Sequence, residues 1–189
     1  MTPIAQSLVA SFRYGCQLKQ TARTGWVQRG IANRESVAAH SYGVAFTAML
    51  LAQQTDDEID IGRVLSLAVL HDLPEALTTD IPTPSWRILP EGAKAEAEDS
   101  AMEAMFADSP HREKIMDLWG ELQAAESKEA KIVHDADKLD MYLQALIYAE
   151  QTGNVLLKEF WNSKPAFHLP ISKEIYEVLG EQFNQTLGR

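Results

Sequence analysis

The amino-acid sequence predicts an all-α fold, and three observations support this prediction. Apolar residues recur at spacings of three and four along most of the 189 residues, which is the period of an amphipathic helix. No segment shows the two-residue alternation and β-branched enrichment that are typical of strands. Proline is absent between Ile4 and Leu73, whereas five prolines lie between residues 74 and 110 and indicate breaks between helices.

The first three predicted helices have clear start or stop signals. Residues 35–54 form the first, whose apolar face is lined by Val37, Ser41, Val44, Ala45, Ala48, Leu51 and Ala52. Asp60 is a suitable N-cap for the second, which is apolar over residues 61–69 and ends before His71. The third is expected over residues 92–106.

The longest predicted helix starts near Ser127 and stops at Gly153. Its apolar side is formed by Ile132, Val133, Ala136, Leu139, Leu143, Leu146 and Ile147. Shorter amphipathic helical segments are expected at residues 115–122, 155–161 and 171–187.

Length and composition limit the classes of protein. The length suits one domain over residues 1–189, with the functional motifs within residues 25–153 and further helices over residues 154–189. The formal net charge of −10 disfavours polymeric nucleic acid as a partner, because such binding relies on Lys and Arg. The single cysteine, Cys16, excludes an intramolecular disulfide and a cysteine-based zinc site. No apolar run approaches the roughly 20 residues that cross a bilayer, and the N-terminus lacks a basic secretory segment. We therefore expect a cytoplasmic protein without membrane partners.

Residues that can bind a metal lie at the ends or in the middle of apolar helices. His71 and Asp72 follow the second helix, His40 lies within the first, and Asp137 lies within the longest. Buried polar groups cost several kcal/mol when unpaired, and a divalent cation is one way to satisfy them. Two imidazoles and two carboxylates suit one six-coordinate transition ion such as Mn²⁺, Co²⁺, Fe²⁺ or Ni²⁺, with Mg²⁺ also possible.

Glu75 lies one turn beyond His71, where a carboxylate can accept a proton from a water whose pKa a cation has lowered. Each candidate also has a simpler interpretation. His40 can be a buried, hydrogen-bonded core histidine, and Asp137 can pair with a neighbouring lysine. Glu75 can be an ordinary first-turn acid. The order His, His-Asp, Asp on apolar helices favours the metal site.

This order is the signature of the HD superfamily of metal-dependent phosphohydrolases, and the chain resembles its 5′-deoxynucleotidase branch over residues 25–153. The resemblance rests on the pair Gly25-Trp26 and on four further segments: Glu35-Ser36-Val37-Ala38-Ala39-His40-Ser41, His71-Asp72-Leu73-Pro74-Glu75, Thr78-Thr79-Asp80-Ile81-Pro82-Thr83-Pro84 and Ala136-Asp137.

The resemblance implies a helical HD domain, a role for each motif residue, and a substrate. The implied metal ligands are His40, His71, Asp72 and Asp137. Glu75 would be the catalytic carboxylate near the attacking water, with Asp72 as an alternative proton acceptor. The implied contacts to the nucleoside and sugar are Trp26, Asp80 and Thr83. The implied substrate is a 2′-deoxynucleoside 5′-monophosphate, the cofactor one divalent transition metal ion, and the assembly a homodimer.

The sequence departs from the pattern at three positions. Gly25 stands where bacterial relatives carry a phosphate-orienting arginine, Trp86 where they carry a basic loop residue, and Ala39 where a glutamate is common. Arg23 or Arg29 is a candidate replacement for the missing arginine, and Trp86 is a further candidate substrate contact. These departures leave two alternatives open: an HD phosphohydrolase for another small nucleotide or phosphate ester, or a non-catalytic, metal-stabilised helical binding module. The presence of Glu75 favours the enzyme.

Overall fold

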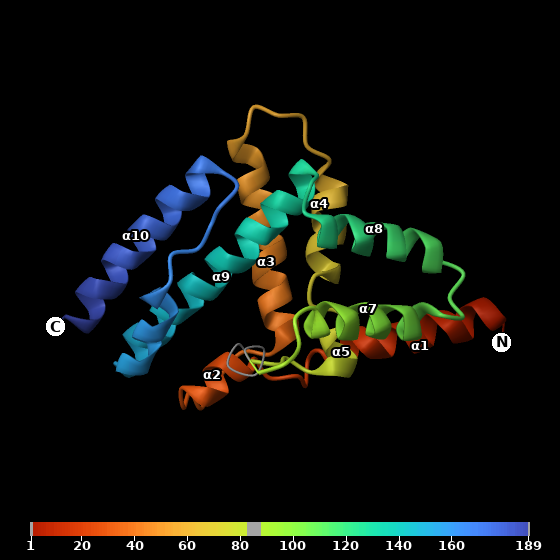
Figure 1. Ribbon diagram of the computed structural model, residues 1–189, viewed down its shortest axis with the longest axis horizontal. Coiled ribbons are helices and arrows are strands. Elements are labelled where there is room, and N and C mark those ends of the chain that lie inside the picture. Colours follow the sequence, from red (N-terminus) through yellow and green to blue (C-terminus); the bar gives the residue numbers. More distant parts are fainter. Residues whose placement is uncertain (1, 83–87, 189) are drawn as a thin grey trace. The chain divides into compact units, whose positions relative to one another are not determined.

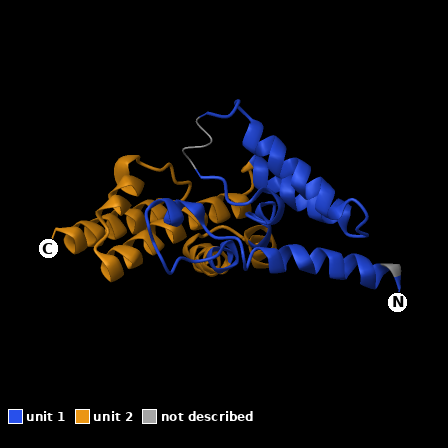
Figure 2. Cartoon of the chain, turned by 90° about the horizontal axis from the view of Figure 1, so that it is seen from below, with its two compact units in different colours: residues 1–41, 69–124 blue, residues 42–68, 125–189 orange. Residues whose placement is uncertain are grey.

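The computed structural model describes residues 2–82 and 88–188, and it confirms the all-α prediction (Figure 1). Within these residues, β pairing is limited to one isolated bridge between Ala22 and Ser36. The chain forms two compact units, which are described separately. The first contains Met1–Ser41 and Val69–Ala124, and the second contains Tyr42–Ala68 and Ala125–Arg189 (Figure 2).

The first unit is built from α1 (Pro3–Gln17), α2 (Thr24–Gln28), α5 (Glu75–Thr78), α7 (Ala93–Phe106) and α8 (Arg112–Ala124). Helix α7 packs against α1, α5 and α8 (Figure 1). Met102, Phe106 and Trp119 are buried in this unit. The indole Nε1 of Trp119 donates a hydrogen bond to Asp99 at 2.7 Å, which satisfies its polar group inside the packed interior.

Helix α3 (Val37–Leu51) starts in the first unit and carries His40 in its first turn. The amide of Val37 donates to the carbonyl of Thr21 at 2.9 Å, and the amide of Ala38 donates to that of Leu18 at 3.2 Å. The Ser36 hydroxyl accepts from the amide of Ala39 at 3.2 Å. The start of α3 is therefore capped by its own serine and by the segment that follows α1.

The second unit contains the remainder of α3, η1 (Ala52–Gln54), most of α4 (Ile61–Leu70), α9 (Lys128–Thr152), η2 (Val155–Asn162) and α10 (Pro170–Leu187). Helix α9 packs against α10 and η2 (Figure 1). Asp135 on α9 is fully buried, and its carboxylate accepts from the amides of His168 and Leu169, each at 2.9 Å. These bonds hold the start of α10 against α9.

The structure confirms the predicted caps. Asp60 accepts from the amide of Arg63 at 3.0 Å, Ser127 accepts from that of Ala130 at 3.1 Å, and Gly153 ends α9 with φ 64°. The segment at 155–161 forms a 3₁₀-helix. Helices α1, α2 and α5 have no counterpart among the predicted helices, and the apolar residues of α1 are largely exposed. No helix in the described part of the chain is long and apolar enough to cross a membrane.

Candidate metal centre and active site

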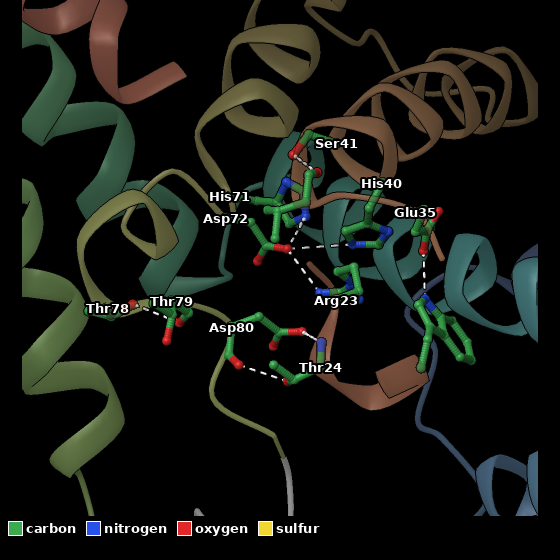
Figure 3. Close-up of polar contacts among 12 residues, drawn as sticks. Arg23, Thr24, Glu35, His40, Ser41, His71, Asp72, Thr78, Thr79 and Asp80 are labelled. Carbon is green, nitrogen blue, oxygen red and sulfur yellow. Dashed lines mark hydrogen bonds and ion pairs between the residues drawn. The ribbon is translucent and has the colours of Figure 1, made fainter. Parts of the chain in front are cut away.

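Three of the four predicted metal ligands lie together in the first unit. Nε2 of His40 lies 3.6 Å from Oδ2 of Asp72, and Nε2 of His71 lies 3.3 Å from the same oxygen (Figure 3). The three residues offer ligand atoms that all lie within 4.8 Å of one another. The fourth predicted ligand, Asp137, is a partly buried residue of α9 in the second unit, and its role stays a prediction.

The end of α4 places His71 and Asp72 at the site. Helix α4 stops at Leu70, and the amide of Leu73 donates to the Leu70 carbonyl at 3.0 Å. The amide of Glu75 then donates to the carbonyl of Asp72 at 3.1 Å and starts α5. Two successive tight turns therefore hold the His-Asp pair and Glu75 in one short segment.

The electrostatic environment keeps Asp72 ionised. Burial alone would raise the pKa of Asp72, but interactions with His71, Arg23 and His40 outweigh burial and hold that pKa well below its usual value. Nη1 of Arg23 lies 3.2 Å from Oδ2 of Asp72 and forms an ion pair with it. Asp72 is therefore a carboxylate over the whole physiological range of pH.

Glu75 has the opposite environment. Its side chain is only 5% exposed, and its Oε2 atom is buried without a hydrogen-bond partner among the described residues. Burial raises the pKa of Glu75 to about 9, and the negative charges of Asp72 and Asp80 add to the shift. A buried acid with a strongly raised pKa beside an ionised acid is typical of functional sites.

The residues present fit a divalent transition metal. Two imidazoles that reach the same carboxylate oxygen through Nε2 supply the mixed nitrogen and oxygen donors that such ions prefer. The unsatisfied buried oxygen of Glu75 nearby is a polar group whose burial a cation or its water would offset.

Asp80 and Trp26, two residues predicted to contact the nucleoside, form hydrogen bonds within the protein. The Asp80 carboxylate accepts from the amide of Thr24 at 2.6 Å, and the Thr24 hydroxyl donates to the Asp80 carbonyl at 2.7 Å (Figure 3). Thr79, immediately before Asp80, has φ 60°, a strained conformation for a β-branched residue. Trp26 is 2% exposed, and its Nε1 donates to Glu35 at 2.9 Å.

The two candidate arginines differ in their contacts. Arg23 reaches Asp72, whereas Nη1 of Arg29 donates to the carbonyl of Gly25 at 3.0 Å. The predicted substrate contacts Thr83 and Trp86 lie outside the described residues.

Two charged residues near the site were not among the candidates. Glu35 accepts from Trp26, and only its place in the His40 motif could have indicated a role. Nζ of Lys94 on α7 lies 3.3 Å from Glu98. Burial opposes the charge of Lys94, but Glu98, and then Asp72 and Glu75, raise its pKa. Lys94 lies ten positions after Pro84, the last residue of the preceding motif, so no local pattern identified it.

Comparison with known proteins identifies the family. A family model described as HD domain matches residues 16–175. The 5′-deoxynucleotidase HDDC2 of Homo sapiens is 36% identical over 183 residues, which cover 94% of this chain and 85% of the human protein. The 5′-deoxynucleotidase hdd1 of Schizosaccharomyces pombe is 34% identical over 174 residues, covering 88% of this chain and 85% of that protein.

A solved structure shows the same fold. The PH0347 protein of Pyrococcus horikoshii OT3 matches with a TM-score of 0.77 and 34% sequence identity, covering 93% of this chain and 98% of that chain. The sequence matches, the shared fold and the approach of the two histidines to Asp72 therefore all indicate the same family. The chain belongs to the HD domain family.

Proposed function

We propose that the protein is a metal-dependent phosphohydrolase that converts 2′-deoxynucleoside 5′-monophosphates to deoxynucleoside and phosphate. The observation that carries this proposal is the convergence of His40 and His71 on the ionised Asp72, with the buried Glu75 in the same segment. The relatives named 5′-deoxynucleotidase, which align with most of the chain, support the choice of substrate.

In this proposal His40, His71, Asp72 and Asp137 hold one divalent transition metal ion. When bound, such an ion supplies positive charge toward phosphoryl oxygens and lowers the pKa of a coordinated water. Glu75 would accept the proton of the attacking water, because its carboxyl is buried in the same short segment as His71 and Asp72. A bound cation would add positive charge beside Glu75 and so favour the carboxylate form that this step needs. The water oxygen would form a bond to phosphorus while the bond from phosphorus to the 5′-oxygen breaks, and the 5′-oxygen would take up the proton that Glu75 accepted, so that deoxynucleoside and phosphate leave.

The remaining residues select the substrate. Arg23, paired with Asp72, offers a cation to the phosphate in place of the arginine absent at Gly25. Asp80 is fixed on Thr24 and forms part of the wall that reads the sugar. We assign further nucleoside contacts to Trp26 and Thr83, and a homodimer, on the family resemblance. Trp86 is proposed as a further substrate contact at the loop position that is basic in bacterial relatives, and the cytoplasmic location is the expectation stated from the sequence.

Phosphate release tests the activity. The protein is assayed with dAMP and AMP in the presence of Co²⁺, Mn²⁺ or Mg²⁺, and we expect turnover with at least one transition ion and a preference for dAMP. Equal kinetics on the two nucleotides would remove the preference for deoxyribose but leave a phosphohydrolase. If neither nucleotide is hydrolysed with any of the three ions, the result contradicts the proposed activity and favours the non-catalytic binding module.

A metal-content measurement tests the ligands. Asp72→Ala is expected to lose the bound metal and turnover together, because the variant removes the carboxylate on which both histidines converge. Elemental analysis that finds full metal content in Asp72→Ala contradicts the ligand assignment.

A further inference from the structure

We propose that Glu35 is a positioning residue that holds the His40 ring in the orientation and tautomer needed to bind a metal through Nε2. This inference rests on the proposed function, because it takes His40 as a metal ligand. Glu35 itself would touch neither the metal nor the substrate. Its carboxylate would accept a hydrogen bond from Nδ1–H of His40, the ring nitrogen that does not bind the metal.

The geometry places Glu35 on the correct side of His40. Nε2 of His40 faces Asp72, so Nδ1 is the nitrogen on the other side of the ring. Figure 3 shows Glu35 on the side of the His40 ring that is opposite to Asp72. A carboxylate oxygen of Glu35 lies within 4.8 Å of a ring nitrogen of His40.

The chemistry of a ligating histidine requires such a partner. A neutral imidazole that binds a metal through one nitrogen carries its proton on the other nitrogen. His40 is fully buried, so water is not available to accept that proton, and an unsatisfied N–H would cost free energy. A carboxylate is the strongest acceptor for this purpose, and its negative charge also makes the imidazole a better ligand.

Glu35 is itself held in place by two neighbours. Its carboxylate accepts from Nε1 of the buried Trp26 at 2.9 Å. Its carbonyl accepts from the amide of Arg23 at 3.4 Å, next to the bridge between Ala22 and Ser36. The carboxylate therefore needs little reorganisation to accept a hydrogen bond from the His40 ring N–H. Holding this carboxylate in place is a structural role for the buried Trp26 indole.

Co²⁺ affinity is the direct test. Wild type, Glu35→Gln and the matched control Glu113→Gln, at an exposed position of α8, are titrated with Co²⁺ against a competing chelator. Gln keeps an oxygen for the Trp26 indole but replaces the second oxygen with an N–H donor. We expect Glu35→Gln to weaken Co²⁺ binding by about 10- to 100-fold, and the control to bind like wild type. Equal affinity of Glu35→Gln and wild type overturns the proposal.

A second measurement separates positioning from folding. In the Zn²⁺-loaded, ¹⁵N-histidine-labelled protein, the Nδ1–H signal of His40, assigned by its loss in His40→Ala, reports the hydrogen bond to Glu35. We expect this signal to shift in Glu35→Gln, while the thermal midpoint of the metal-free variant stays close to that of Glu113→Gln. A Glu35→Gln protein that is destabilised but keeps the wild-type His40 signal overturns the proposal.

The failure of this inference and that of the proposed function are distinguishable. Co²⁺ affinity is measured without a nucleotide, so a wild-type protein that binds Co²⁺ but releases no phosphate contradicts only the activity. Unchanged Co²⁺ affinity in His40→Ala contradicts the ligand assignment and the role of Glu35 together.

Discussion

Nη1 of Arg23 lies 3.2 Å from Oδ2 of Asp72, and the pair joins the segment before α2 to the turn after α4. Both side chains are largely but not completely buried, at 15% and 17% exposure. The same carboxylate oxygen faces Nε2 of His40 and of His71. Asp72 is thus the common neighbour of Arg23, His40 and His71.

The contacts of the two candidate arginines predict different effects on catalysis. Arg23→Ala is expected to lower kcat/KM for dAMP by roughly 10- to 100-fold, because a hydrogen bond to a charged group contributes about 1.5–3 kcal/mol. Arg29→Ala is expected to change it less, since Arg29 donates to the Gly25 carbonyl. Steady-state kinetics on dAMP with Co²⁺ measure both. A larger loss in Arg29→Ala would reverse the assignment of the phosphate cation.

The buried Glu75 predicts a separation of metal binding from turnover. Glu75→Gln preserves the shape of a side chain that is 5% exposed but removes its ability to accept a proton. We expect kcat to fall by about 10²- to 10⁴-fold, whereas the Co²⁺ content stays at the wild-type value. Elemental analysis and kinetics on one preparation check this. A parallel loss of metal would show that Glu75 is a ligand and not the proton acceptor.

The sequence predicted the parts of the fold and site that depend on neighbouring residues. The bounds of α4 and α9 follow from Asp60, Ser127 and Gly153, which are local capping signals. His71 and Asp72 are consecutive residues in the sequence, and the helical period places His40 on an apolar face. Local patterns were therefore sufficient for most helices and for choosing His40, His71 and Asp72, which lie close together, as candidate ligands.

Contacts between distant segments could not be predicted in this way. The choice between Arg23 and Arg29 depends on which guanidinium reaches a residue 49 positions away. Trp26 donates a hydrogen bond to Glu35, which adjoins the isolated bridge between Ala22 and Ser36, and a single bridge leaves no strand pattern in the sequence. Helix α1 is a different case, because its sequence has a clear amphipathic period and a capping residue, Thr2, which the sequence prediction did not use.

We predict that the folded protein loses stability at high pH because the phenol of Tyr142 is buried. It is 3% exposed, and burial raises its pKa to about 12 from an ordinary value of 10. Because the unfolded chain loses the phenolic proton first, the contribution of Tyr142 is complete below pH 10. It is lost as the pH rises from 10 to 12.

Urea unfolding of wild type and Tyr142→Phe from pH 9 to 12 measures this contribution. The difference between their free energies of unfolding should change across that range in favour of the phenylalanine variant. Tyr42→Phe, at a ring that is 75% exposed, is the matched control. The same change in the Tyr42→Phe series would show that burial of Tyr142 is not its cause.

We predict that Gly43 of α3 and Asp140 of α9, both in the second unit, are coupled in their effects on the free energy of unfolding. A Cβ atom added at Gly43 would overlap Oδ1 of Asp140 and would lie 2.8 Å from its Cγ, far inside contact distance. Alanine in place of glycine within a helix ordinarily stabilises by about 1 kcal/mol. Here the overlap is expected to reverse the sign, so that Gly43→Ala destabilises the protein by about 1–3 kcal/mol.

A double-mutant cycle isolates the overlap. Asp140→Ala removes the three atoms nearest to the new methyl group, so Gly43→Ala should become stabilising in that background. The measurement is urea unfolding of wild type, both single variants and the double variant in metal-free buffer. If Gly43→Ala has the same effect in both backgrounds, the close approach of the Asp140 carboxylate does not determine the choice of glycine in α3.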